Sequence, residues 1–226
     1  MKFVIIGLGQ FGRQLATELE HERHEVVAVD INERIVEDIK DEVDLAVVAD
    51  ASDIKALEQL GLDEADVVVV AIGDDFAASL LVTGHLQELE VKRLVCRSLN
   101  PTHEKILRLM QVDEIVQAEE MAARQLAKRL GIRGAARHFA LGDAHAIVEI
   151  EAPVWLCGKT LAESQLRGRF GLNLVTVRRA AEGGESEGRP IGVPEPDTRF
   201  ERGDRLIVFG TETGVVAFAE SKGQRA

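Results

Sequence analysis

The sequence has few cysteines, a shortage of positive charge and no long apolar run. Its 226 residues include two cysteines, Cys96 and Cys157, which are too few for a disulfide framework. No apolar run reaches the roughly 18 residues that span a bilayer, so any membrane role is expected to be peripheral. The 27 lysines and arginines stand against 39 acidic residues, and the net charge of −12 argues against nucleic acid as a partner.

Catalytic motifs are also missing. None of the six histidines belongs to a recognisable catalytic motif, and Cys96 lies in an apolar run typical of a buried strand. The sequence has no Cys/His zinc spacing, no P-loop and no G-x-S-x-G motif. We therefore expect a binding protein rather than an enzyme. The chain opens in a strand pattern at Met1 with no signal-peptide region, so a cytoplasmic location is expected.

Short apolar runs rich in β-branched residues alternate with segments of helical spacing in the first part of the chain. Such runs are typical of strands buried on both faces, and their alternation with helices predicts βαβ crossovers. We expect an α/β fold, with a Rossmann-like doubly wound parallel sheet over residues 1–135. Six strands are predicted, at residues 3–6, 26–29, 45–49, 67–72, 94–96 and 114–116.

The pattern changes after a long helical stretch and a break at residues 134–136. A second, small α+β domain is expected over residues 136–226. Residues 182–196 are rich in glycine and proline and predict an exposed hairpin or loop, and residues 223–226 predict a frayed tail. The predicted strands are 146–150, 172–177 and 206–209, and the predicted helical segments are 160–166 and 213–219.

A glycine motif follows the first predicted strand and opens the first predicted helix. We expect Gly7 to make the tight turn, Gly9 to let the backbone approach a pyrophosphate, and Gly12 to let helix and strand pack closely. The helix N-terminus would offer its N–H groups to the phosphates. Asp30 follows Gly12 by 18 residues, at the end of the second predicted strand, where an acidic side chain accepts hydrogen bonds from ribose. Together these residues predict a nucleotide site.

The carboxylate of Asp30 also bears on which nucleotide binds. It would repel a 2′-phosphate, and Arg34 lies one helical turn further on, so NADP is disfavoured. NAD(H) and the mononucleotides ATP and ADP remain open.

Further candidates lie at the ends of later strands, where open parallel sheets bind ligands. Asp50 and Ser52 have an alternative interpretation as caps of the next helix. Arg97 is expected to meet phosphate oxygens or else to pair with Asp74 or Asp75. The full set of predicted binding residues is Gly7, Gly9, Gln10, Phe11, Gly12, Asp30, Asn32, Asp50, Ala51, Ser52, Ala71, Ile72, Gly73 and Arg97.

Glu119 follows the sixth predicted strand and begins the long helical stretch. It is a candidate ligand of a divalent cation, Mg²⁺ or Ca²⁺, beside bound phosphates. The alternative is an ordinary acidic residue at a helix N-terminus.

The chain resembles the RCK-domain cytosolic regulatory subunits of Trk/Ktr potassium transporters, of the KtrA-like type with one RCK unit. The glycine motif, Asp30, the DAS segment at residues 50–52 and the AIGD segment at 71–74 carry the resemblance in the first half. Residues 158–163 (GKTLAE), 171–175 (GLNLV) and 201–206 (ERGDRL) carry it in the second half. The first half would be the RCK N-terminal (TrkA-N) lobe, and the second the C-terminal (TrkA-C) lobe.

The resemblance implies a non-enzymatic, nucleotide-sensing subunit that gates potassium uptake. In this family the RCK lobes dimerise and assemble, usually into an octameric ring, on the cytoplasmic side of a TrkH- or KtrB-like membrane subunit that translocates the ion. The glycines would contact phosphates, Asp30 the ribose, and Asp50 and Ser52 the adenine side. Glu119 matches the cation position of some members, and some C-terminal lobes bind cyclic di-AMP. ATP-responsive members commonly carry a basic residue at the position of Gln10, so the choice between NAD(H) and ATP/ADP stays open.

Two other functions are compatible with the glycine motif. One is a free-standing nucleotide-binding regulator of another transporter, and the other is an NAD-dependent oxidoreductase. The lack of a recognisable catalytic motif disfavours the oxidoreductase.

Overall fold

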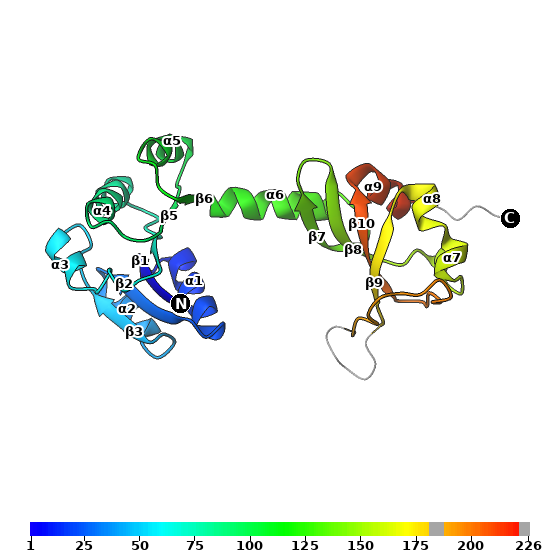
Figure 1. Cartoon of the computed structure of the whole chain (residues 1–226), viewed down its shortest axis with the longest axis horizontal. Coiled ribbons are helices and arrows are strands. Elements are labelled where there is room, and N and C mark those ends of the chain that lie inside the picture. The colour runs from blue at the N-terminus through cyan, green and yellow to red at the C-terminus, as the bar shows by residue number, and fades with distance from the viewer. Residues whose placement is uncertain (181–187, 222–226) are drawn as a thin grey trace. The chain divides into compact units, whose positions relative to one another are not determined.

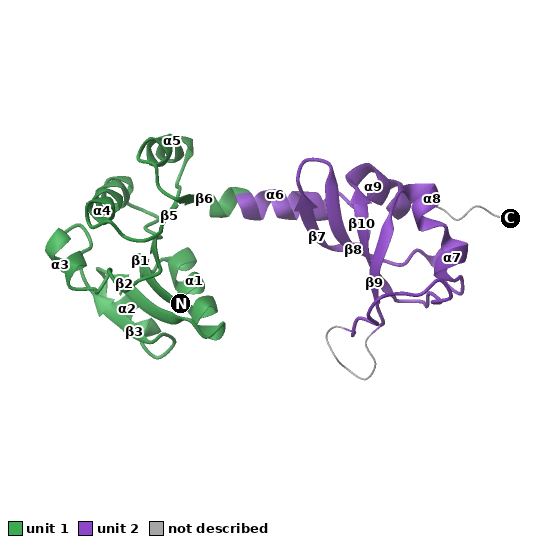
Figure 2. Cartoon of the chain, in the orientation of Figure 1, with its two compact units in different colours: residues 1–120 green, residues 121–226 purple. Residues whose placement is uncertain are grey.

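The computed structural model describes residues 1–180 and 188–221 of the chain (Figure 1). The chain divides into two compact units, Met1–Glu120 and Met121–Ala226 (Figure 2). The sequence predicts a domain boundary after residue 135. In the structure the division falls after Glu120, and the long helical stretch therefore lies mostly in the second unit. Residues 182–187 of the predicted loop and the predicted tail at 223–226 lie outside the described residues.

The first unit is a six-stranded parallel sheet in the order β3-β2-β1-β4-β5-β6, with helices between the strands (Figure 1). All six strands occur where the sequence predicts them, and the doubly wound Rossmann-like sheet is confirmed. In chain order the elements are β1 (Lys2–Ile6), α1 (Gln10–His21), β2 (Glu25–Asp30), α2 (Glu33–Ile39), β3 (Leu45–Val48), α3 (Ile54–Glu58), β4 (Val67–Val70), α4 (Phe76–Glu88), β5 (Leu94–Arg97), α5 (Pro101–Leu109) and β6 (Glu114–Val116).

Helices cover both faces of this sheet because its central strands are apolar on both sides. Ile5 of β1 packs in one cluster with side chains of α1 and α2. Its neighbours Val4 and Ile6 point to the opposite face and pack with side chains of α3, α4 and α5. β1 pairs with β2 on one side and with β4 on the other, so the strand order reverses direction at β1. In such sheets the ligand crevice lies at this point, beyond the carboxyl ends of the strands.

The second unit contains a four-stranded antiparallel sheet in the order β7-β8-β10-β9. Its own core includes Phe200 and Phe218, both fully buried. This is the small α+β lobe that the sequence predicts. Its elements are α6 (Ala118–Leu130, shared with the end of the first unit), β7 (Ala135–Leu141), β8 (His145–Glu151), a 3-10 turn (Val154–Leu156), α7 (Leu161–Ser164), α8 (Leu166–Phe170), β9 (Asn173–Arg178), β10 (Arg205–Thr211) and α9 (Glu212–Glu220).

The motifs of the second half have structural roles. Thr160 and Glu163 form a capping box at the start of α7, each side chain binding the backbone N–H of the other. Asp204, almost fully buried, accepts hydrogen bonds from the backbone of Glu201 and from Arg179 at 2.8 and 2.6 Å. These contacts tie the turn before β10 to β9.

Strand β7 is an element that the sequence analysis missed, because residues 134–136 read as a break. The strand alternates poorly: His138 is its buried residue, whereas Arg137 and Phe139 are exposed. Such a mixed pattern carries little periodic signal, and β7 is specified by its antiparallel pairing with β8.

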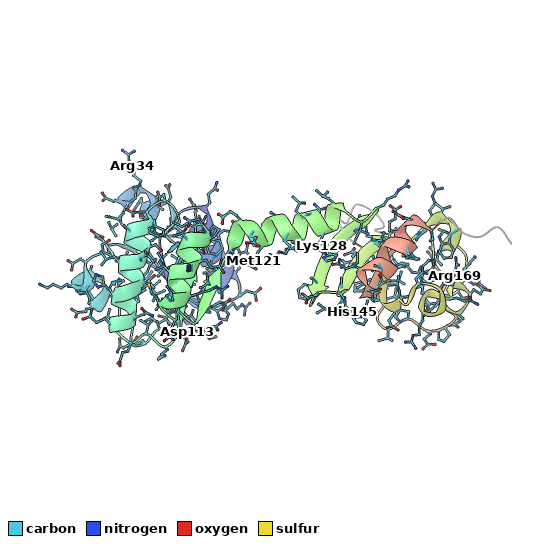
Figure 3. All side chains as sticks on the ribbon, turned by 90° about the horizontal axis from the view of Figure 1, so that it is seen from above. Arg34, Asp113, Met121, Lys128, His145 and Arg169 are labelled. Atoms are coloured by element: carbon cyan, nitrogen blue, oxygen red, sulfur yellow. The ribbon has the colours of Figure 1, made fainter. Side chains whose placement is uncertain are left out.

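Helix α6 has an unusual environment. All thirteen of its residues are described, and none of them is buried. Met121 and Leu130 are 62% and 70% exposed, and Figure 3 labels Met121 and Lys128 on this helix. No helix in the described parts of the chain combines the length and apolar character needed to cross a membrane.

Two glycines determine how β1 passes into α1. Gly7 has a positive φ of +93°, which strains any L side chain, and its N–H donates to the carbonyl of Val29 at 2.8 Å. A Cβ atom on Gly12 would lie 1.9 Å from the carbonyl oxygen of Gly7 and 3.1 Å from Cβ of Ala71. The helix therefore sits directly on the turn and on the end of β4, as the sequence predicts for Gly12.

This contact predicts the effect of Gly12→Ala. The new methyl group would collide with backbone rather than with a flexible side chain, so we expect a loss of roughly 1–3 kcal/mol of unfolding free energy. Gly84→Ala is the matched control, because Gly84 lies within α4 and its added Cβ would meet nothing within 4 Å. That substitution should stabilise the protein by about 0.5–1 kcal/mol. Urea unfolding of both variants measures the difference, and equal effects would contradict the packing described.

Candidate nucleotide-binding site

A cavity of about 760 Å³ opens at the carboxyl ends of β1 to β5. It lies at the point where the strand order reverses, as expected for an open α/β sheet. It is lined by Ile6, Gly7, Gly9, Gln10, Val29, Asp30, Ile31, Asn32, Ile35, Ala49, Asp50, Ala51, Ser52, Ile72, Gly73, Asp74, Asp75, Ala78, Val82 and Arg97.

The glycine turn presents a bare helix N-terminus to this cavity. Gly9 is the N-cap of α1, and among the described residues no side chain caps this helix. By contrast, α2, α3, α4 and α5 are capped by the side chains of Asn32, Asp53, Asp75 and Asn100. A Cβ on Gly9 would meet nothing within 4 Å, so the space above the turn is open. The free N–H groups of α1 and this space fit a phosphate group.

The carboxylate of Asp30 is held in place by backbone N–H groups. One oxygen accepts from Leu8 at 2.6 Å and the other from Asn32 at 2.8 Å. This arrangement connects the glycine turn to the end of β2, and the remaining lone pairs of the carboxylate suit ribose hydroxyl donors. Arg34 is exposed and points away from the first unit (Figure 3). The cavity therefore offers no cation beside Asp30 among its described lining residues, in keeping with an unphosphorylated ribose.

The Asp50–Ser52 turn does not cap the following helix. The N-cap of α3 is Asp53, whose carboxylate accepts from the N–H of Lys55. The Asp50 side chain instead accepts from the N–H of Ser52 at 2.9 Å and closes the turn at the cavity wall. The alternative interpretation of Asp50 and Ser52 as helix caps is therefore wrong, and both residues line the cavity.

Arg97 brings positive charge to the far side of the cavity. Its side chain is 15% exposed, and its guanidinium lies 5.6 Å from the centre of the Phe11 ring. The guanidinium pairs with the carboxylate of Glu119, so the expected pairing with Asp74 or Asp75 is not what the structure has. Its Nε atom is buried and has no hydrogen-bond partner among the described residues. A buried guanidinium with a spare donor fits an anionic ligand.

The other charged residues of the described lining are acidic. Four carboxylates, those of Asp30, Asp50, Asp74 and Asp75, face the cavity, and Arg97 is the single cationic residue among its described lining. Phosphate groups are therefore expected at the end formed by Arg97 and the N-terminus of α1. The acidic side chains suit the donor groups of a nucleoside.

Glu119 lies in the first turn of α6 and is 69% exposed. Its own backbone N–H, followed by the Arg97 guanidinium, holds the pKa of Glu119 below its ordinary value. Within residues 1–180 and 188–221, no three His, Cys, Asp or Glu side chains gather closely enough to hold a metal ion. Among the described residues, Glu119 thus lacks a cluster of protein donors, and a divalent cation beside bound phosphates stays a prediction.

Three predicted binding residues lie outside the cavity lining. Gly12 and Ala71 are buried where α1 meets β4. The Phe11 ring packs against the guanidinium of Arg97. The sequence analysis also missed part of the wall, including Ile35 of α2 and Val82 of α4. The apolar spacing of those helices gave no sign of which residues face the crevice.

Two family models match the chain: a TrkA-N domain over residues 3–118 and a TrkA-C domain over residues 145–223. The chain belongs to the TrkA-N/TrkA-C family. The two matches fall within the two compact units of the structure and agree with the RCK resemblance expected from the sequence.

The relatives of this TrkA-N/TrkA-C protein include potassium uptake proteins. Ktr system potassium uptake protein C of Bacillus subtilis is 34% identical over 217 residues, which cover 96% of this chain and 95% of that protein. Ktr system potassium uptake protein A of the same organism is 30% identical, with the same coverage. The protein of that name from Vibrio alginolyticus is 30% identical over 93% of each chain.

Solved RCK structures share the fold of this family member. A GsuK channel bound to NAD superposes with a TM-score of 0.65 at 19% identity, covering all of this chain and 40% of the channel chain. The isolated GsuK RCK domain gives a TM-score of 0.61 at 19% identity and covers 99% of this chain and 48% of that one.

The two cysteines should differ in reactivity. Cys96 is fully buried on β5, and burial raises the pKa of its thiol to about 11. Iodoacetamide at about pH 8 should therefore modify the partly exposed Cys157 and spare Cys96 in the folded protein. Peptide mass spectrometry after timed labelling measures this.

The free energy of unfolding should depend on pH through the same Cys96 thiol. Its pKa in the folded state lies above the ordinary value of 9.0. The contribution of the Cys96 thiol to the free energy of unfolding is therefore complete below pH 9.0 and falls as the pH rises towards 11. Equal labelling of both cysteines in the folded protein would contradict the burial of Cys96.

Proposed function

We propose that this protein is a nucleotide-sensing regulatory subunit of a potassium uptake system. The observation that carries the proposal is the cavity itself. It combines the uncapped N-terminus of α1, the backbone-anchored Asp30 and the buried Arg97 in a chain built from TrkA-N and TrkA-C domains. The membrane partner is an integral potassium-translocating subunit of TrkH or KtrB type. The regulatory subunit is located on the cytoplasmic side of the membrane.

The bound nucleotide lies across the cavity with its phosphates over Gly9 and beside Arg97. Its ribose hydroxyls donate to Asp30, which the glycine turn already holds in position. The adenine lies towards the wall formed by Ile35 and the Asp50–Ser52 turn. Binding and orientation are the tasks of these residues, and the protein acts as a sensor without catalysis.

The charge of the lining favours a ligand with few phosphate charges. One arginine faces four carboxylates, and Gln10 contributes no charge. NAD(H) and ADP therefore fit this lining better than ATP, whose third phosphate would need a further cation. The GsuK channel, which shares this fold and has been solved with NAD bound, supports NAD(H) as a ligand. A divalent cation at Glu119 would need donors from a second copy of the chain.

Regulation requires assembly and unequal binding. The exposed helix α6, with Met121 and Leu130 in contact with solvent, supports contacts with further copies in a dimer and an octameric ring. A nucleotide shifts the ring only to the extent that it binds one ring state more tightly than another.

Thermal unfolding with NAD, NADH, ADP, ATP and cyclic di-AMP, each with and without Mg²⁺ or Ca²⁺, tests the binding. We expect NAD(H) or ADP to raise the melting temperature, because a ligand of the folded state stabilises it. Asp30→Ala should remove most of this shift, since its carboxylate is the ribose acceptor. Asp63→Ala, at an exposed site outside the cavity, is the matched control and should keep the shift. A full ligand shift in Asp30→Ala would contradict the site.

Uptake in cells tests the regulatory role. The chain is co-expressed with its membrane subunit in cells that lack potassium uptake, and rubidium influx is followed. Influx should depend on the regulatory chain and should fall with Asp30→Ala but not with Asp63→Ala. Influx that is unchanged when the chain is omitted would reject this role, and co-purification with a different transporter would identify the alternative partner.

A further inference from the structure

Arg97 lies between the cavity and the start of α6. β5 and β6 pair in parallel with Arg97 opposite Val116, so the chain that leaves β6 runs past the end of β5. Three residues after Val116, the carboxylate of Glu119 meets the Arg97 guanidinium. The same guanidinium lines the cavity on its other side.

The guanidinium has little freedom to move. The Phe11 ring lies beneath it, with 5.6 Å between the guanidinium carbon and the ring centre. A Cβ on Gly73 would lie only 2.6 Å from one of its terminal nitrogens, so the backbone of the β4 turn closes another side. The strand that carries Arg97 is paired on both edges. Phe11 and Gly73 therefore confine the cation on two sides, and the anion that it binds is the part that can be exchanged.

The two partners of this ion pair differ in their exposure to water. Arg97 is 15% exposed and Glu119 is 69% exposed. Water can solvate the Glu119 carboxylate, whereas the buried guanidinium depends on an anion for its charge and hydrogen bonds. A phosphate at the N-terminus of α1 would approach from the cavity side and offer several acceptor oxygens.

We propose that the phosphates of the bound nucleotide and the Glu119 carboxylate compete for the Arg97 guanidinium, so that nucleotide binding releases Glu119 at the start of α6. This inference rests on the proposed nucleotide site. It assigns Glu119 as an internal competitor of the ligand and Arg97 as the group through which the site acts on α6. The division between the two units falls directly after this helical turn, at Glu120.

Competition makes a distinctive prediction for affinity. Removing the competing carboxylate in Glu119→Gln should tighten binding of NAD or ADP by about fivefold or more. Arg97→Ala should weaken binding, and in that background Glu119→Gln should have no effect. The double-mutant cycle therefore gives a coupling that independent effects cannot produce. Isothermal titration calorimetry of the four proteins with NAD and with ADP measures it.

The matched control for charge is Glu114→Gln. Glu114 also pairs with an arginine, Arg93, at 2.6 Å across β5 and β6, and both side chains are about half exposed. Glu114→Gln removes the same charge from the same unit, but its partner Arg93 does not line the cavity as Arg97 does, so affinity should be unchanged. Arg97→Lys keeps the charge and serves as a second probe if Arg97→Ala unfolds. In that background Glu119→Gln should still tighten binding.

Hydrogen exchange gives a readout that a merely structural ion pair would not move. Saturating NAD or ADP should increase amide exchange in the second turn of α6, whose N–H groups donate to the carbonyls of the first turn, in the natural protein and should leave it unchanged in Glu119→Gln. Equal affinities of the natural protein and Glu119→Gln, or additive effects in the cycle, would overturn the competition. If the natural protein binds none of the nucleotides while remaining folded, the nucleotide site itself fails and the inference falls with it.

Discussion

The first unit depends on the close approach of α1 to the ends of β1 and β4. At Gly12 the helix lies so near the turn at Gly7 that no side chain fits between them. Gly9 in the same turn leaves the N-terminal N–H groups of α1 without a side-chain cap, and the turn brings the N–H of Leu8 to the carboxylate of Asp30. Packing and the geometry of the candidate site thus depend on one turn, because the turn that allows the approach also lines the cavity.

The distribution of charge follows from the same topology. Parallel strands end at one edge, so the acidic residues after β2, β3 and β4 and the arginine at the end of β5 all reach one crevice. Carboxylates collected in this way would repel one another and any phosphate nearby. Arg97 and the positive end of the α1 dipole offset that repulsion at one end of the cavity, which gives the site a direction.

Sequence patterns were sufficient for the sheet and for most residues of the candidate cavity. The six β-branched runs predicted the strands, and strand ends predicted Asp30, Asp50 and Arg97, because both depend on local sequence and on a general rule of topology. Strand β7 could not be predicted, since its pairing with β8 rather than its own pattern specifies it. The partner of Arg97 was also missed. That pairing arises from the register of β5 with β6, which a single sequence does not display.

The register of β5 and β6 matters because it gives the ligand a differential interaction to act through. A nucleotide that only filled the cavity would stabilise every state of the subunit equally and would regulate nothing. Arg97 changes this, because its guanidinium lies beside Phe11 and Gly73, pairs with Glu119 and belongs to a residue that lines the cavity, where a phosphate would compete for it. Under the proposed competition, the state in which Glu119 pairs with Arg97 and the state in which phosphate pairs with it differ in free energy by an amount that depends on the ligand. Since Glu119 belongs to the first turn of α6, that difference is delivered to the helix that leads into the second unit.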